Sequence, residues 1–103
     1  MLLLNIDYIP GKEFEVLSLV KGTVVQSKNF GKDFMAGMKT LVGGEIVGYT
    51  EMLVEARQIA TKRMVDEAEE MGADAVLNIR YGSSSIMQSA AEIVAYGTAV
   101  KYI

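Results

Sequence analysis

The sequence contains no cysteine and no histidine. Without cysteine, a disulfide framework, a thiolate metal site and a cysteine nucleophile are all excluded. Without histidine, the commonest metal ligand and the commonest general base are missing as well. Positive charge is also scarce, because 10 Lys and Arg residues stand against 13 Asp and Glu residues, for a net charge of −3. A partner with a phosphate backbone, such as DNA or RNA, is therefore not expected.

Long hydrophobic runs are absent too. No apolar stretch approaches the ~20 residues that a membrane-spanning helix needs. The first four residues are apolar, but no basic residue precedes them, and Asn5 and Asp7 end the run too early for a signal peptide. The sequence therefore predicts no membrane partner and a cytoplasmic location.

What the chain does have is apolar content in a short length. Its 103 residues predict a single domain over residues 1–103. Half of the residues are hydrophobic, and the mean hydropathy is +0.24. This is more apolar surface than one small core readily hides, so we expect the chain to self-associate. The alternative is a tight monomer with a rich core.

Three segments have the composition of strands. Residues 14–27 and 92–103 are rich in β-branched and aromatic side chains, and residues 75–81 form a shorter apolar run. Gly82 and the three serines after it predict a turn or a frayed loop. Residues 2–9 predict an extended arm, which a Pro-Gly pair separates from the first long strand.

Two segments predict helices. Residues 31–41 carry apolar side chains at helical spacing, which predicts a short helix. Residues 50–71 predict the main helix, with Thr50 as its N-cap and Gly72 as its left-handed C-terminal residue. Its apolar arc is wider than one sheet face needs, which again favours a neighbouring subunit. The elements together predict an α/β (α+β) fold, with about three antiparallel strands packed on one long helix plus a short helix.

Charged residues crowd the end of the predicted main helix. Lys62 with Asp66, and Arg63 with Glu67, are spaced to pair one turn apart. The carboxylates of this region do not converge as ligands of a hard cation would. A solvated charged face is therefore the favoured interpretation.

Short motifs are distributed along the whole chain in a fixed order. They are GGEI at 43–46, YT at 49–50, AR at 56–57, RM at 63–64, EA at 67–68, GADAV at 72–76 and EIVAYGTAV at 92–100. This ordered set resembles the YbjQ family, small bacterial and archaeal proteins that carry a heavy-metal-binding label. The resemblance also covers IPG at 9–11 and VKG at 20–22. It implies a dodecin-like subunit that assembles into a pentameric ring.

The sequence offers few side chains that could bind a heavy metal. Soft metals favour thiolate, thioether and imidazole ligands, and of these only the methionine thioether is present. Met35 and Met38, three positions apart on the predicted short helix, are the candidate metal ligands, for instance for Cu(I). The alternative is that both methionines fill a core or a subunit seam. The sequence does not identify a cofactor. A metal ion is a candidate, but the chain has few residues that could bind it.

Arg57 is a charged residue at an unusual position for its type. By helical angle it falls among the apolar residues of the main helix, where a cation needs a partner. Glu45 and Glu92, both inside the family-like motifs, are the candidate partners. Arg57 is then either part of an ion pair within or between subunits, or an anion-binding group in a cleft. Tyr49 completes the candidate ligand-binding or interface residues.

The sequence favours a non-enzymatic oligomeric binding or scaffold protein, holding a metal ion or a small ligand at subunit interfaces. One alternative is an enzyme with an inter-subunit cleft that uses Glu45, Glu92 and Arg57. The other is a structural adaptor ring whose partner is another protein.

Overall fold

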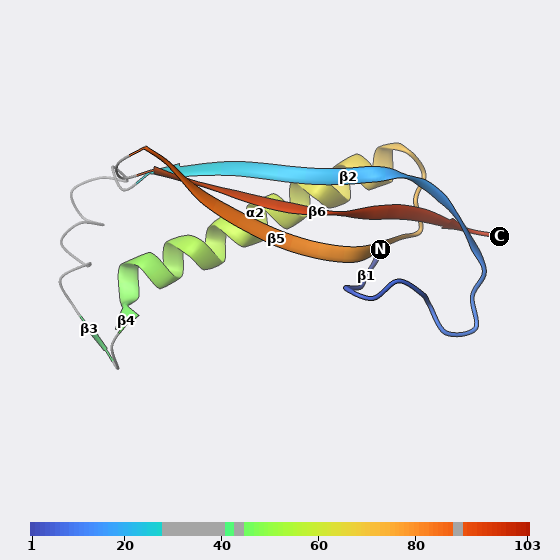
Figure 1. Cartoon of the computed structure of the whole chain (residues 1–103), viewed down its shortest axis with the longest axis horizontal. Helices are drawn as coiled ribbons and strands as arrows, with labels where there is room; N and C mark the ends of the chain where they lie inside the picture. Colours follow the sequence, from blue (N-terminus) through green and yellow to red (C-terminus); the bar gives the residue numbers. More distant parts are fainter. Residues whose placement is uncertain (28–40, 43–44, 88–89) are drawn as a thin grey trace.

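The computed structural model describes residues 1–27, 41–42, 45–87 and 90–103. Its elements, in chain order, are β1 (Leu2–Leu3), β2 (Phe14–Ser27), β3 (Leu41–Val42), β4 (Glu45–Ile46), α2 (Val47–Glu70), β5 (Ala75–Met87) and β6 (Ala90–Tyr102). One sheet has the strand order β1-β5-β6-β2, and α2 crosses one face of it obliquely (Figure 1). The predicted short helix over 31–41 lies outside the described residues, except for Leu41, which begins β3.

The α+β class is confirmed, but the sheet has four strands and is mixed. β2 and β5 both pair with β6 in antiparallel fashion. The predicted extended arm supplies the fourth strand, because Leu2 and Leu3 pair in parallel with Ala75 and Val76. Two residues are too few to be recognised from sequence pattern as a strand.

β5 is longer than the sequence predicted. The expected turn at Gly82 and the following serines is wrong, because this segment continues the ladder with β6 as far as Met87. Ser83 lies opposite Ile93, and Ser84 lies opposite Glu92. Pairing to a long neighbouring strand outweighs the weak intrinsic strand preference of serine and glycine.

The start of α2 differs from the prediction, whereas its end at the left-handed Gly72 agrees with it. The helix begins at Val47, directly after β4, so Thr50 lies inside the helix and is not its N-cap. At the other end, Gly72 has a φ of 77°. The Gly72 amide donates to Glu69 O (3.0 Å) and the Ala73 amide donates to Ala68 O (3.1 Å). This pair of bonds is a Schellman motif, which satisfies carbonyls that the helix end leaves open.

Replacing Gly72 by alanine should therefore destabilise the chain by about 1 kcal/mol, because an L-residue pays that amount in the left-handed region. Urea unfolding at fixed protein concentration measures the change. Gly72→Asn should lose less, since asparagine enters this region more readily. Equal stability of Gly72→Ala and the wild type would contradict this account of the helix end.

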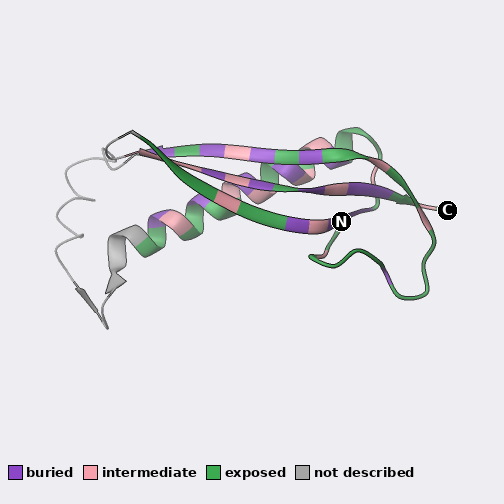
Figure 2. Cartoon of the chain, in the orientation of Figure 1, coloured by how far each residue is buried: buried purple, intermediate pink, exposed green. Residues whose placement is uncertain are grey.

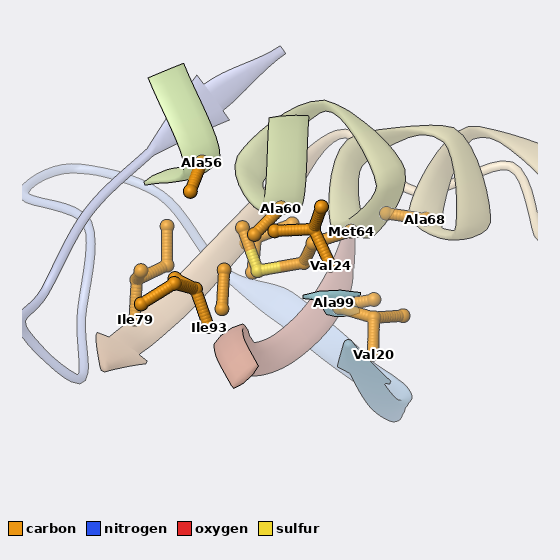
Figure 3. Close-up of a cluster of buried hydrophobic side chains, with 11 residues drawn as sticks. Val20, Val24, Ala56, Ala60, Met64, Ala68, Ile79, Ile93 and Ala99 are labelled. Carbon is orange, nitrogen blue, oxygen red and sulfur yellow. The ribbon is translucent and has the colours of Figure 1, made fainter. Parts of the chain in front are cut away.

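The main core lies between α2 and the sheet. The fully buried helix residues recur every fourth position, and the cluster joins them to strand residues such as Val20, Ile79 and Ile93 (Figures 2 and 3). This core row of α2 comprises Met52, Ala56, Ala60, Met64 and Ala68. Four residues advance the side chain by about 40° more than one full turn. The buried row therefore drifts around the helix as α2 crosses the sheet.

The other face of the sheet is covered only at one end. Ile9 from the arm packs there with Leu77 and Val100, supported by Leu4 and Phe14. The rest of this face has no cover from the described residues. Its exposed apolar side chains are Leu19 (62% exposed), Val25 (55%) and Tyr96 (41%).

A bulge in β5 holds the arm in place. Asn78 has a φ of 55°, a left-handed conformation that asparagine tolerates better than most residues. Its amide donates to Ile6 O (3.0 Å), and the Ile79 amide donates to Leu4 O (3.1 Å). The arm thus follows the outer edge of β5 as far as Ile79.

Candidate functional site

A groove opens between α2 and β5 because the helix packs on β2 and β6 and leaves β5 largely uncovered. We call it the α2–β5 groove; its volume is about 500 Å³, and it is lined by Val54, Arg57, Gln58, Thr61, Lys62 and Tyr81. A neighbouring hollow of about 170 Å³ shares Arg57 and Tyr81 and extends to Ser83 and Ile93. Arg57 and Tyr81 therefore lie where the two hollows meet.

The side chains of α2 form four lengthwise rows, because the buried row repeats every four residues. The row facing β5 is fixed by Thr61, whose Oγ1 lies 2.8 Å from Tyr81 OH. The row facing β2 is fixed by Arg63, whose Nη1 donates to Thr23 O at 2.6 Å. By the four-residue spacing, Leu53 and Arg57 share the β5-side row of Thr61, and Glu51, Glu55, Ile59 and Glu67 share the β2-side row of Arg63.

The hydrogen bonds at the groove floor have a definite direction. The Thr61 hydroxyl donates to Arg57 O at 2.7 Å. A hydroxyl has one proton, so the bond between Thr61 and Tyr81 must be donated by Tyr81. The Tyr81 oxygen is then left as an acceptor, and the Arg57 guanidinium is the strong donor at this place. The groove is therefore suited to an anionic group beside an apolar and aromatic surface.

Within this chain Arg57 is exposed, and it does not lie in the buried row of α2. A helical wheel that assumes a straight apolar stripe places Arg57 on that stripe. The buried row instead repeats every four residues and runs through Ala56 and Ala60, so Arg57 lies beside it. Among the described residues, the ion pair present is Lys62 with Asp66 at 2.9 Å, and Arg57 takes no part in it.

The predicted partners of Arg57 do not all converge on it. Glu92 precedes the buried Ile93 in β6, so its side chain points to the face of the sheet opposite α2. Glu45 lies in β4 and Tyr49 in the first turn of α2, and the placement of their side chains falls outside the described part. Met35 and Met38 lie outside the described residues altogether.

One of the two predicted helix pairs forms. Lys62 and Asp66 pair as expected. The pair between Arg63 and Glu67 is wrong, because Arg63 reaches across to the backbone of β2 instead. A carbonyl at the edge of a sheet lacks a strand partner, so it attracts the long side chain.

Sequence reasoning missed Thr61 and Tyr81 as groove residues. The sequence pattern assigned neither residue to a site. The available signal was that Arg57 and Thr61 are four positions apart, and so lie on one row of the helix. Nothing in the sequence places this row against β5.

Comparison with known proteins decides the family. The YbjQ family model, described as "Putative heavy-metal-binding", matches residues 1–103. This chain belongs to the YbjQ family. UPF0145 proteins of Clostridium novyi and Alkaliphilus metalliredigens are 64% and 60% identical to it over 103 residues, covering all of each chain. A UPF0145 protein of Vibrio parahaemolyticus is 56% identical over 104 residues, covering 100% of this chain and 99% of that one.

A solved structure shares the fold of this YbjQ protein. It is a protein of unknown function of the DUF74 family from Pediococcus pentosaceus, with a TM-score of 0.66. The match covers 100% of this chain and 98% of the other at 11% sequence identity. At that identity the likeness extends to the fold alone.

The family description names heavy metals, and the donor set of this YbjQ chain does not fit them. The chain has no cysteine or histidine, the ligands that soft and borderline metals prefer. Within the described ranges, no three acidic side chains gather as an alternative oxygen site. Of the ligands that soft metals favour, the chain offers only methionine thioethers. The same part of the chain contains no helix with the length and apolar character of a membrane span.

Proposed function

We propose that this YbjQ protein is a non-enzymatic oligomeric binding or scaffold protein. Arg57, in the α2–β5 groove, anchors an anionic group of what it binds. The observation that carries this proposal is an exposed guanidinium beside an aromatic wall, with no carboxylate paired to it among the described residues. The anionic group is a carboxylate or a phosphate, which the planar guanidinium binds with two parallel hydrogen bonds. It belongs either to a small ligand or to a protein surface.

Self-association is supported by the uncovered part of the sheet. Leu19, Val25 and Tyr96 expose large apolar side chains on the face opposite α2, which an interface would bury. We propose a dodecin-like subunit in a cytoplasmic pentameric ring, as the family resemblance implies. In the alternative adaptor role, another protein covers this face. The measured mass of the assembly distinguishes this role from self-association.

The enzyme alternative requires residues from more than one subunit. Its three residues were to act in one cleft, and Glu92 faces away from Arg57 across the thickness of the sheet. A general base must lie within hydrogen-bond reach of the reacting group that its partners hold. Within one subunit, this pair of residues cannot share a substrate.

The test replaces Arg57 by methionine, which keeps the length and apolar contacts of the side chain. We expect the free energy of unfolding to change by less than about 0.5 kcal/mol, because an exposed side chain without a partner contributes little. Native mass spectrometry of protein purified without chelator should show wild-type mass above that of the monomer. We expect Arg57→Met to lose part of that excess mass.

Lys12→Met is the matched control, because it removes one positive charge from the loop between the arm and β2, away from the groove. It should keep the wild-type mass. If the wild type is a bare monomer, or if Arg57→Met keeps all of the excess mass, the proposed function is wrong.

A further inference from the structure

The sheet has two open edges. β2 is the outermost strand on one side and runs for 14 residues, and no strand among the described residues pairs with its outer edge. On the other side, the arm covers β5 only as far as Ile79. From Arg80 to Ser84, the outer edge of β5 has no partner strand in the described part of the chain. Open edges of this kind are templates for pairing with a further strand.

A second copy of the chain fits both edges at once. β2 and β5 run in the same direction, because each is antiparallel to β6. Pairing β2 of one copy with β5 of the next uses part of both edges, whereas pairing β2 with β2 would leave the β5 edge unpaired. Arg63 already donates to Thr23 O on the β2 edge, and that carbonyl keeps a second lone pair for a strand partner.

The spacing of the strands determines where the second helix would lie. At the level of Tyr81 the sheet is three strands wide, because β1 pairs only with the first residues of β5. Three strands at ~4.8 Å repeat the structure every ~14 Å. A helix with its side chains is about 10–12 Å across. The α2 of a copy paired at the β5 edge would therefore lie along the open side of the α2–β5 groove.

The charges of the two flanks of α2 are complementary at this level. The flank facing β5 carries Arg57, and the opposite flank carries the exposed Glu51 and Glu55. Glu55 is only two residues from Arg57, about 3 Å along the helix axis. Because the two flanks point in opposite directions, these carboxylates cannot reach Arg57 of their own chain. The β2-side flank of a second copy would present them to it.

From these observations we propose that the anionic group bound by Arg57 is a carboxylate of a second copy of this chain, Glu55 or Glu51. That copy adds its β2 edge to the Arg80–Ser84 edge of β5, and its α2 forms the missing wall of the groove. The contact is head to tail, so each copy uses one edge and one helix flank toward each neighbour, and repetition closes a ring if the rotation allows it. This inference rests on the proposed function and names the partner at the same site.

Charge reversal tests the assigned pair. Arg57→Glu places three carboxylates at the contact, and we expect native mass spectrometry and light scattering to show at least ~10-fold weaker assembly, since like charges in a contact are costly. The variant Arg57→Glu with Glu51→Arg and Glu55→Arg restores opposite charges at every contact, and should assemble again. Lys12→Glu makes the same change of charge in the loop before β2 and should assemble as the wild type does.

Hydrogen exchange tests the assigned edge. The amides of Arg80–Ser84 that point away from β6 should be protected in the assembled wild type and should exchange quickly in the dissociated Arg57→Glu variant, because alternate amides of β5 are already bonded to β6. Protection of the β2 edge without protection of β5 would identify a β2–β2 contact and overturn the inference.

The remaining outcomes separate this inference from the proposed function. Arg57→Glu that assembles like the wild type, or that dissociates and is not rescued by the exchanged charges, overturns the inference. If Arg57→Met loses a small bound mass while the number of subunits is unchanged, the inference fails and the proposed function stands. A monomeric wild type overturns both.

Discussion

Replacing Gly22 by alanine should remove most of the stability of the fold. Gly22 lies in β2 directly beneath α2, and an added Cβ would meet the backbone atoms Ala60 O and Met64 N, as well as Arg63 Cβ at 2.8 Å. Backbone atoms of a packed helix cannot turn aside as a flexible side chain can. Overpacking a core costs about 1–3 kcal/mol where side chains can adjust, and we expect at least the upper end of that range here. Urea unfolding followed by circular dichroism measures the loss.

Gly82→Ala is the matched control for this prediction. Gly82 is also a glycine inside a strand, but an added Cβ there would meet only Val94 Cγ1 at 3.4 Å. We expect its unfolding midpoint to stay close to that of the wild type. Similar stability of the two alanine variants would show that α2 does not lie as close to β2 as described.

Replacing Met64 by alanine is expected to have the second largest effect. Met64 is fully buried at the centre of the core row and is the largest of the fully buried side chains among the described residues (Figure 3). Its neighbours in the row are alanines, so no long helix side chain beside it can fill the space. Truncating a buried methionine to alanine costs about 2–5 kcal/mol, with the larger values where the cavity cannot collapse.

The control for this cavity makes the same chemical change at Met71. This residue follows the end of α2 and is 38% exposed. Met71→Ala should cost less than about 1 kcal/mol, because the side chain leaves water only in part. If the two substitutions cost the same free energy, the core assigned to α2 is wrong. Both comparisons are made at one protein concentration, since assembly adds to the apparent stability.

The long elements of the fold were predictable because their patterns are long. β2 matches its predicted bounds, residues 14–27, and the end of α2 at Gly72 follows from glycine's access to positive φ. β1 was not predictable, because its pairing depends on where the start of β5 lies in space. The strand continuation through Ser83 depends on the ladder to β6, which no local pattern encodes.

The candidate site shows the same division between local and tertiary information. A fixed helical wheel assigns Arg57 to the core, and only the oblique crossing of α2 over the sheet rotates it into the groove. That Arg57 and Tyr81 line the same groove depends on the tertiary position of β5. The family was identifiable from ordered motifs, whereas the site required the angle between one helix and one sheet.

The bulge at Asn78 sets a limit on the length of any strand added to β5. The arm occupies the edge up to Ile79, so an incoming strand that slides toward the start of β5 meets the arm and stops. A flat edge of uniform residues offers many nearly equal registers, and such edges permit misaligned pairing. In the contact proposed above, the chain's own backbone closes one end of the edge that a second strand would pair with. For that contact, the arm lowers the number of possible strand alignments between two subunits before any side chain has to discriminate between them.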